Sequence, residues 1–239
     1  MNTTDAVENE ATIEARAAGG VYGALARMFA SAPTERSYTE FIQVAHLLGC
    51  DELAPGGVDF ATAEAAFDAR FVVPGGRMYV PLSENCIALA GEESAAVGNG
   101  TVPDPVSVPR IAWGPLGGAR SAHAAACYAA AGFNSDAVRA GSPEAATLRD
   151  DSLAVELAFM AYLAAGETVA GEVGDDARTQ NARDWQARFL RDHLLTWVGR
   201  AATSARTHKR RPLRPRRPAC RVLVQVRRCA PGVMRGGSQ

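Results

Sequence analysis

The stretch LRDDSLAVELAFMAYLAA, residues 148–165, decides the fold of this chain. Two adjacent carboxylates, Asp150 and Asp151, precede a segment whose only charged residue is Glu156. A helix that is apolar on every side is usually buried at the centre of a helical domain. A carboxylate inside such a helix must be paired, hydrogen-bonded or turned toward a cleft, because an isolated buried charge is very costly. The stretch therefore predicts a buried central helix that begins at about Asp151.

Helical spacing of apolar residues recurs on both sides of this stretch. Local signals mark several boundaries: Pro33 and Gly132 follow helical segments as stops, Asp59 suits an N-cap, and Ser142 suits the N-cap of a short helix. We expect no strand. The sequence predicts an all-α fold, a single helical bundle of about eight helices, and the clearest of the other helical segments are about 11–30, 38–48, 60–71, 119–131 and 175–202.

Residues 74–118 are rich in Gly and Pro and show little periodicity. A long segment of this kind inside a compact domain is usually functional or disordered. We interpret its later part, about 90–118, as a hinge loop between an N-terminal and a C-terminal helical half. Some local order is expected around 79–89.

The net charge of −1 conceals a strong asymmetry. Residues 206–239 hold 11 of the 25 basic residues and no Asp or Glu, so residues 1–205 carry 14 basic residues against all 26 acids. We predict that 206–239 is a disordered basic tail. One alternative is an arm that contacts nucleic acid. Another is a frameshift in or near codons 203–208, because a GC-rich gene read out of frame yields an Arg-, Pro- and Gly-rich product.

The N-terminus is acidic and polar rather than a secretory signal. No apolar run reaches the roughly 18 residues that span a bilayer. We therefore expect a cytoplasmic protein without a membrane span.

Spacing along the chain indicates no metal or cofactor site. The five cysteines include no CxxC pair, and neither glycine-rich segment is a P-loop or a GxGxxG motif. His46, His123 and His208 have no metal-like spacing, and His193 lies on an apolar stripe where a core histidine is expected. A Cys127–His123 catalytic pair lacks any supporting motif. We expect no catalytic residue, no cofactor and no bound transition metal.

Several motifs together resemble the TorD/DmsD/NarJ-type family of molybdoenzyme maturation chaperones. The central stretch contributes an acidic pair followed by Glu-Leu and Phe-Met, with Ser152 where the family usually has His. The remaining matching motifs, in chain order, are ARAAGGVYGALARMFASAP, FVVPGGRMYVPLSEN, WGPLGGARSAHAAACYAAAGF and WQARFLRDHLLTWV. Their order and spacing cover about residues 15–202.

The resemblance implies a chaperone domain over 1–205 without enzymatic turnover. Such proteins bind the twin-arginine signal peptide, or the body, of a molybdopterin oxidoreductase subunit and hold it in the cytoplasm during cofactor insertion. A peptide with two guanidinium groups and an apolar helix needs carboxylates beside an apolar groove. The resemblance thus implies that the following residues bind peptide: Asp150, Asp151, Ser152, Glu156, Phe159, Tyr79, Glu84 and Trp113.

Other readings remain open at this point. The acidic pair suits a simple helix start, where negative charge complements the helix dipole. Glu156 suits a structural ion pair with a core arginine. A helical regulator whose basic tail contacts nucleic acid is the main functional alternative, and a small helical enzyme that uses the acidic cluster is a third. The client enzyme is left open, and a homodimer is compatible with the sequence.

Overall fold

The computed structural model describes residues 3–50, 58–73, 78–92 and 111–207. The all-α prediction is confirmed. The predicted hinge and the basic tail lie mostly outside the described residues. Residues 203–207 of the span assigned to a frameshift fall within a described helix. The α-helices are α1 Thr3–Ala30, α2 Glu35–Leu47, α3 Phe60–Phe67, α4 Glu84–Ala88, α5 Ala119–Ala131, α6 Asp136–Arg139, α7 Leu153–Glu172, α8 Asp176–Phe189 and α9 Leu195–Thr207.

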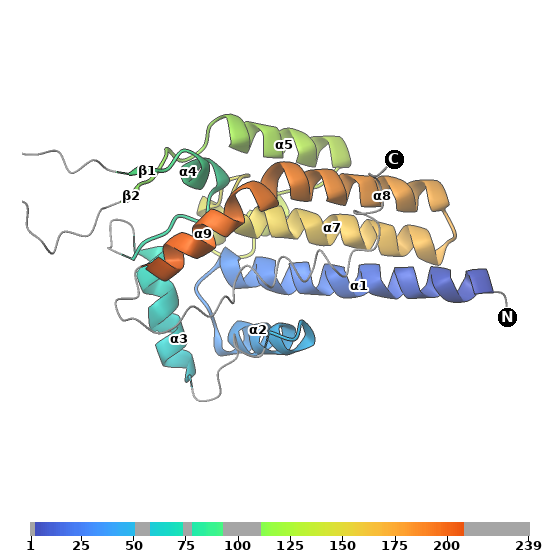
Figure 1. The fold of residues 1–239 in the computed structure, drawn as a ribbon, viewed down its shortest axis with the longest axis horizontal. Coiled ribbons are helices and arrows are strands. Elements are labelled where there is room, and N and C mark those ends of the chain that lie inside the picture. The colour runs from blue at the N-terminus through green and yellow to red at the C-terminus, as the bar shows by residue number, and fades with distance from the viewer. Residues whose placement is uncertain (1–2, 51–57, 74–77, 93–110, 208–239) are drawn as a thin grey trace, which may run out of the picture.

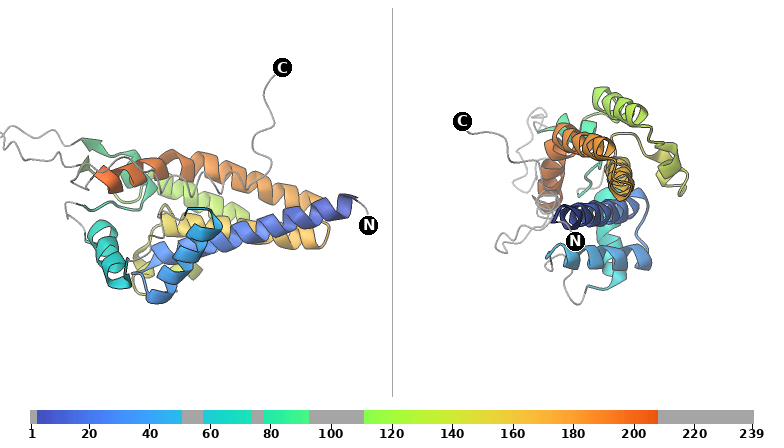
Figure 2. Two further views of the ribbon diagram at one scale, coloured as in Figure 1. Left: turned by 60° about the horizontal axis from the view of Figure 1, so that its bottom comes forward. Right: turned by 90° about the vertical axis from the view of Figure 1, so that its right-hand side faces the viewer.

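Helices α1, α7 and α8 form the body of the bundle (Figures 1 and 2). The central helix α7 packs between α1 and α8, and α2 covers another side of α1. The short helix α4 contacts both α5 and α9 at one end of the bundle. This end also holds a two-residue antiparallel pair, β1 Gly91–Glu92 with β2 Ile111–Ala112, where we expected no strand.

Helix α7 is the core helix that the central stretch predicts. Its side chains Val155, Phe159 and Met160 are fully buried. The Phe159 ring lies 4.8 Å from the rings of both Tyr128 and Phe189, measured between centroids, so α5, α7 and α8 share one aromatic core. Burial of large aromatic and aliphatic side chains supplies most of the folding free energy of such a domain.

Glycines allow α1 to lie close against α7. A Cβ atom built on Gly19 would meet the Ala164 Cβ at 3.4 Å, and one on Gly23 would meet the Ala161 Cβ at 3.9 Å. Gly19 therefore lies at the close contact between the two helices. Its neighbour Gly20 has no described atom within 4 Å of such a Cβ and takes no part in the contact.

Several predicted boundaries are confirmed by hydrogen bonds. The Asp59 side chain accepts from the Thr62 amide at 2.7 Å and caps α3. Gly132 ends α5 with a φ of 75°, a left-handed conformation that favours glycine. Ser142 accepts from the Ala145 amide at 3.0 Å, although the element that follows is a single 3-10 turn, Ala145–Thr147.

The predicted helix 175–202 is wrong in one respect, because the structure divides it. A π turn, η4 Leu190–Leu194, separates α8 from α9, and Figure 1 shows the chain bending there. The segment 190–194 contains no proline or glycine that would mark an irregular turn, so the sequence pattern does not reveal it. The turn places His193 and Leu194 in the interior of the bundle.

By length and composition alone, α7 passes a test for membrane-spanning helices, and 67% of the tested window is buried inside the protein. The helix is not an uninterrupted apolar run of about 18 residues, because Glu156 and Glu167 lie within it. A central core helix meets the same criteria, so the finding is weak evidence for a membrane span.

Candidate functional site

Two segments that are far apart in the sequence meet at the start of α7. The Ser83 and Ser152 backbones form an isolated antiparallel bridge. The Glu84 amide donates to the Asp151 carbonyl at 2.8 Å, and the Leu153 amide donates to the Leu82 carbonyl at 2.9 Å. Residues 81–84, which include the predicted site residue Glu84, and the acidic pair Asp150-Asp151 are thus parts of one structure.

Asp151 holds this junction together and is fully buried. Its Oδ2 accepts from the Ser83 hydroxyl at 2.6 Å and from the Asn85 amide at 3.0 Å. The carboxylate thereby anchors the first turn of α4 to the entry of α7. Ser152, in the position of the family histidine, donates its hydroxyl to the Arg149 carbonyl at 2.6 Å and is nearly buried.

Glu84 is the centre of a second set of buried contacts. Its Oε2 lies 2.6 Å from His193 Nδ1, and its Oε1 accepts from Arg120 at 2.5 Å and from the Thr196 hydroxyl at 3.2 Å. Burial alone would raise the pKa of the Glu84 carboxyl. The bonds and charges of His193 and Arg120 outweigh that cost and hold the pKa below its ordinary value.

Glu156 behaves in the opposite way. Burial, reinforced by the charge of Glu84, raises the pKa of the Glu156 carboxyl well above its ordinary value. Its Oε2 accepts from Trp197 Nε1 at 3.1 Å. Its Oε1 is buried and accepts no hydrogen bond from the described residues. The predicted ion pair with a core arginine is wrong, since the partners of Glu156 are an indole and a second carboxyl group.

The surroundings of Glu84 and Glu156 therefore shift the two carboxyl pKa values in opposite directions, which favours a proton on Glu156 beside an ionised Glu84. Their nearest oxygens, together with a His193 nitrogen, lie within 4.8 Å of one another. Two carboxyl groups in contact cannot both ionise easily, and different surroundings decide which of them keeps the proton. The proton on Glu156 also satisfies a buried oxygen that would otherwise be left without a partner.

This assignment predicts the behaviour of Glu156→Gln. A folded-state pKa raised above the unfolded value of about 4.3 means that the stabilising proton is present at low pH and is lost as pH rises through the folded pKa. Glutamine keeps the hydrogen bonds and cannot ionise. We expect unfolding free energies within about 1 kcal/mol of each other at pH 5, and a weaker decline with rising pH in the variant. Denaturant titrations at pH 5 to 9 measure both, and a loss of several kcal/mol at every pH would contradict the assignment.

Asp150 differs from its buried neighbours, because 26% of its side-chain surface is exposed. Its Oδ1 accepts from Arg139 at 2.5 Å and from the Ser135 hydroxyl at 3.1 Å. Its carbonyl accepts from the Tyr128 hydroxyl at 2.6 Å. Sequence patterns did not single out Arg139, which lies on the four-residue helix α6, too short to leave a periodic signal.

The other predicted site residues lie at different depths. Tyr79 and Trp113 are partly exposed, and Trp113 packs against the core beside Gly114, whose amide donates to the Cys86 carbonyl at 3.0 Å. Phe159 is completely buried in the aromatic core, away from any surface. The structure thus brings together Glu84, Asp151, Ser152 and Glu156 in a buried cluster. Asp150 lies at the solvent-exposed edge of this cluster, which we call the rim, and Phe159 is not part of it.

Residues 112–203, from β2 to α9, match the family model of the nitrate reductase delta subunit. This match is to the NarJ/TorD-type maturation chaperone family. The resemblance recognised in the motifs is therefore confirmed. No curated protein and no solved structure matches the chain. The match implies a role in the maturation of a nitrate reductase-like molybdoenzyme, and the matched family is one of chaperones rather than catalysts. The matched segment contains Asp150, Asp151 and Glu156, whereas Glu84 lies outside it and is joined to it by the bonds above.

Proposed function

We propose that this protein is a cytoplasmic chaperone that binds the twin-arginine signal peptide, or the adjoining body, of a molybdopterin oxidoreductase catalytic subunit. Binding assists cofactor insertion and delays export. The observation that carries the proposal is the family match over the segment that contains the acidic pair. Asp150 is the member of that pair with access to solvent.

The Asp150–Arg139 contact supports a role in guanidinium binding. It already joins a carboxylate to an arginine side chain in hydrogen-bonding geometry at a partly exposed position. A peptide arginine presents the same group and exchanges with Arg139 at little cost in solvation. Carboxylate–guanidinium bonds are among the stronger hydrogen bonds in proteins. The acidic body, with 14 basic residues against 26 acids over 1–205, attracts a basic peptide from a distance.

Two exposed leucines are available to the apolar part of the peptide. Leu89 and Leu116 are 59% and 65% exposed. The loop that carries Leu116 touches both sides of the junction: the Pro115 carbonyl accepts from the Asn85 amide group at 2.9 Å, and Gly117 lies against Arg149. In this proposal the peptide contacts the rim. The buried carboxyl groups of Asp151, Glu84 and Glu156 hold the segments around the rim in place and do not touch the peptide.

The test is Asp150→Asn, measured by calorimetry with a synthetic client leader peptide. Hydrogen bonds to charged groups contribute roughly 1.5–3 kcal/mol, so affinity should fall at least about tenfold while the circular dichroism spectrum is unchanged. Asp136→Asn is the matched control, because Asp136 bonds to the same Arg139 at 2.7 Å and has an 84% exposed side chain. Equal affinities for wild type and Asp150→Asn would exclude the rim as the peptide site.

A further inference from the structure

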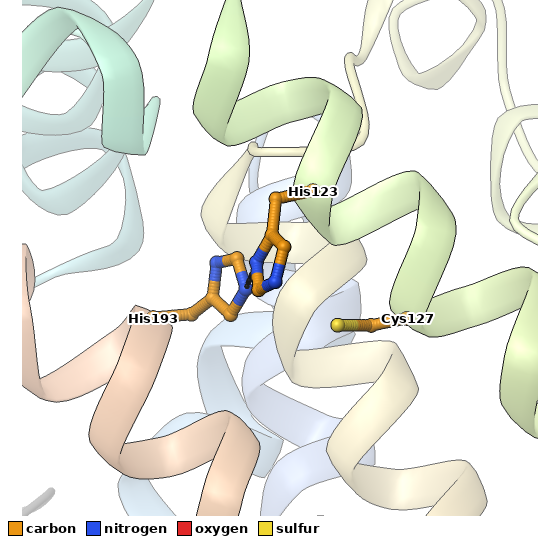
Figure 3. A group of neighbouring side chains, drawn as sticks. All are labelled: His123, Cys127 and His193. Carbon is orange, nitrogen blue, oxygen red and sulfur yellow. Dashed lines mark hydrogen bonds between the residues drawn. The ribbon is translucent and has the colours of Figure 1, made fainter.

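A second cluster of polar side chains lies on the other side of Glu84. His123 and Cys127 are one turn apart on α5, and His193 projects from η4 toward them (Figure 3). A ligand atom of each, a histidine nitrogen or the Cys127 sulfur, lies within 4.8 Å of the others. Figure 3 shows the two imidazole rings meeting, with the sulfur on the same side of α5. His123 and His193 are 70 residues apart in the chain, so sequence spacing did not bring them together.

Glu84 orients the His193 ring for ligation. Because an ionised carboxylate only accepts, His193 Nδ1 donates its proton to Glu84 Oε2 at 2.6 Å. A metal-binding imidazole must be neutral, and with the proton on Nδ1 its lone pair is on Nε2, the nitrogen that lies 2.8 Å from His123 Nδ1. A carboxylate that holds the far nitrogen of a ligating histidine is the usual arrangement around protein-bound zinc.

The spacing of the three groups suits a metal ion with small side-chain movements. Tetrahedral zinc with two Zn–N bonds of about 2.05 Å places the nitrogens about 3.3 Å apart. The two rings must therefore separate by about half an ångström from their present hydrogen bond. The nitrogen–sulfur separation at such an ion is about 3.6 Å. The ligand atoms of the cluster already lie within 4.8 Å of one another, so the sulfur needs only a small movement. Two imidazoles and a thiolate are a ligand set for zinc-class ions rather than for Mg²⁺ or Ca²⁺.

The cluster also has the access that an ion needs. His123 is exposed and Cys127 is partly exposed, whereas His193 is buried. Sites with three protein ligands keep a fourth position for water or for a donor from another molecule. The π turn that presents His193 is a local irregularity of a kind often found at functional sites.

We propose that His123, Cys127 and His193 form a binding site for a zinc-class divalent metal ion, with the fourth position open toward solvent. This inference does not depend on peptide binding. It revises the expectation of a metal-free protein, which rested on spacing along the sequence.

The experiment uses the untagged full-length protein, titrated with Zn²⁺ and with Co²⁺ as a spectroscopic substitute. We expect one equivalent of zinc bound by wild type and a thiolate-to-cobalt charge-transfer band in the near ultraviolet. His123→Asn and Cys127→Ser should each weaken binding more than tenfold, and Cys127→Ser should abolish the band. His46→Asn, a change of an exposed histidine on α2, should alter neither. Glu84→Gln should weaken binding about 10- to 100-fold without removing the band at saturation.

Three results would overturn the proposal. The first is no binding by wild type. The second is binding that His123→Asn leaves unchanged, which would place the ion elsewhere on the chain. The third is cobalt binding without a thiolate band. Because His123 is exposed, His123→Asn should keep the fold, and circular dichroism of each variant identifies any loss caused by unfolding alone.

Discussion

Asp151→Ala should lower the free energy of unfolding by about 3–5 kcal/mol. The change leaves the Ser83 hydroxyl and the Asn85 amide without their buried acceptor, and hydrogen bonds to a carboxylate contribute roughly 1.5–3 kcal/mol each. It also frees the first turn of α4 from the entry of α7. For a protein of this size the melting temperature should fall by about 10 °C.

The matched control for this variant is Asp176→Ala. Asp176 lies in the first turn of α8 and is exposed, so its removal costs only the helix-dipole contribution of about 0.3–1 kcal/mol. Guanidinium titrations followed by circular dichroism compare the two. Equal losses for both variants would show that Asp151 acts as an ordinary helix-start charge, which is the simpler reading of the acidic pair.

Phe159→Ala should destabilise the protein by a similar amount, about 3–5 kcal/mol, through the cavity it leaves in the aromatic core. Its ring contacts those of Tyr128, Phe133 and Phe189, and its side chain is fully buried. Phe159→Leu keeps most of the volume and should cost less than about 1.5 kcal/mol. Chemical denaturation measures both changes.

The same variants separate packing from peptide contact. If Phe159 lies in the core, the folded fraction of Phe159→Leu should bind the leader peptide with wild-type affinity at a temperature below its melting transition. A drop in affinity of more than tenfold with normal stability would return Phe159 to the peptide-binding surface.

Much of the fold follows from local signals in the sequence. Asp59, Gly132 and Asp175 mark helix ends because their side chains or backbone satisfy end groups within three residues. The burial of α7 follows from its composition, since few polar groups interrupt it. These features depend on neighbours along the chain, which a sequence pattern contains directly.

The candidate site depends on contacts between distant segments, and here sequence reasoning was incomplete. It named Glu84, Asp151 and Glu156 as peptide-binding residues, whereas all three side chains are buried. Their burial arises because α4 and α9 close over the start of α7. The partner of Glu156 was wrong for the same reason: Trp197 lies 41 residues away and reaches it only through the bend at η4.

The most direct test of the proposed function is capture of the client by the full-length protein. An affinity-tagged copy is expressed in its native host, purified under mild salt, and analysed by mass spectrometry, with the Asp150→Asn variant alongside. We expect wild type to retain a molybdopterin oxidoreductase catalytic subunit that still carries its leader and lacks cofactor, and the variant to retain much less. Recovery of nucleic acid in place of any such subunit, or equal recovery of the subunit without its cofactor by both proteins, would contradict the account.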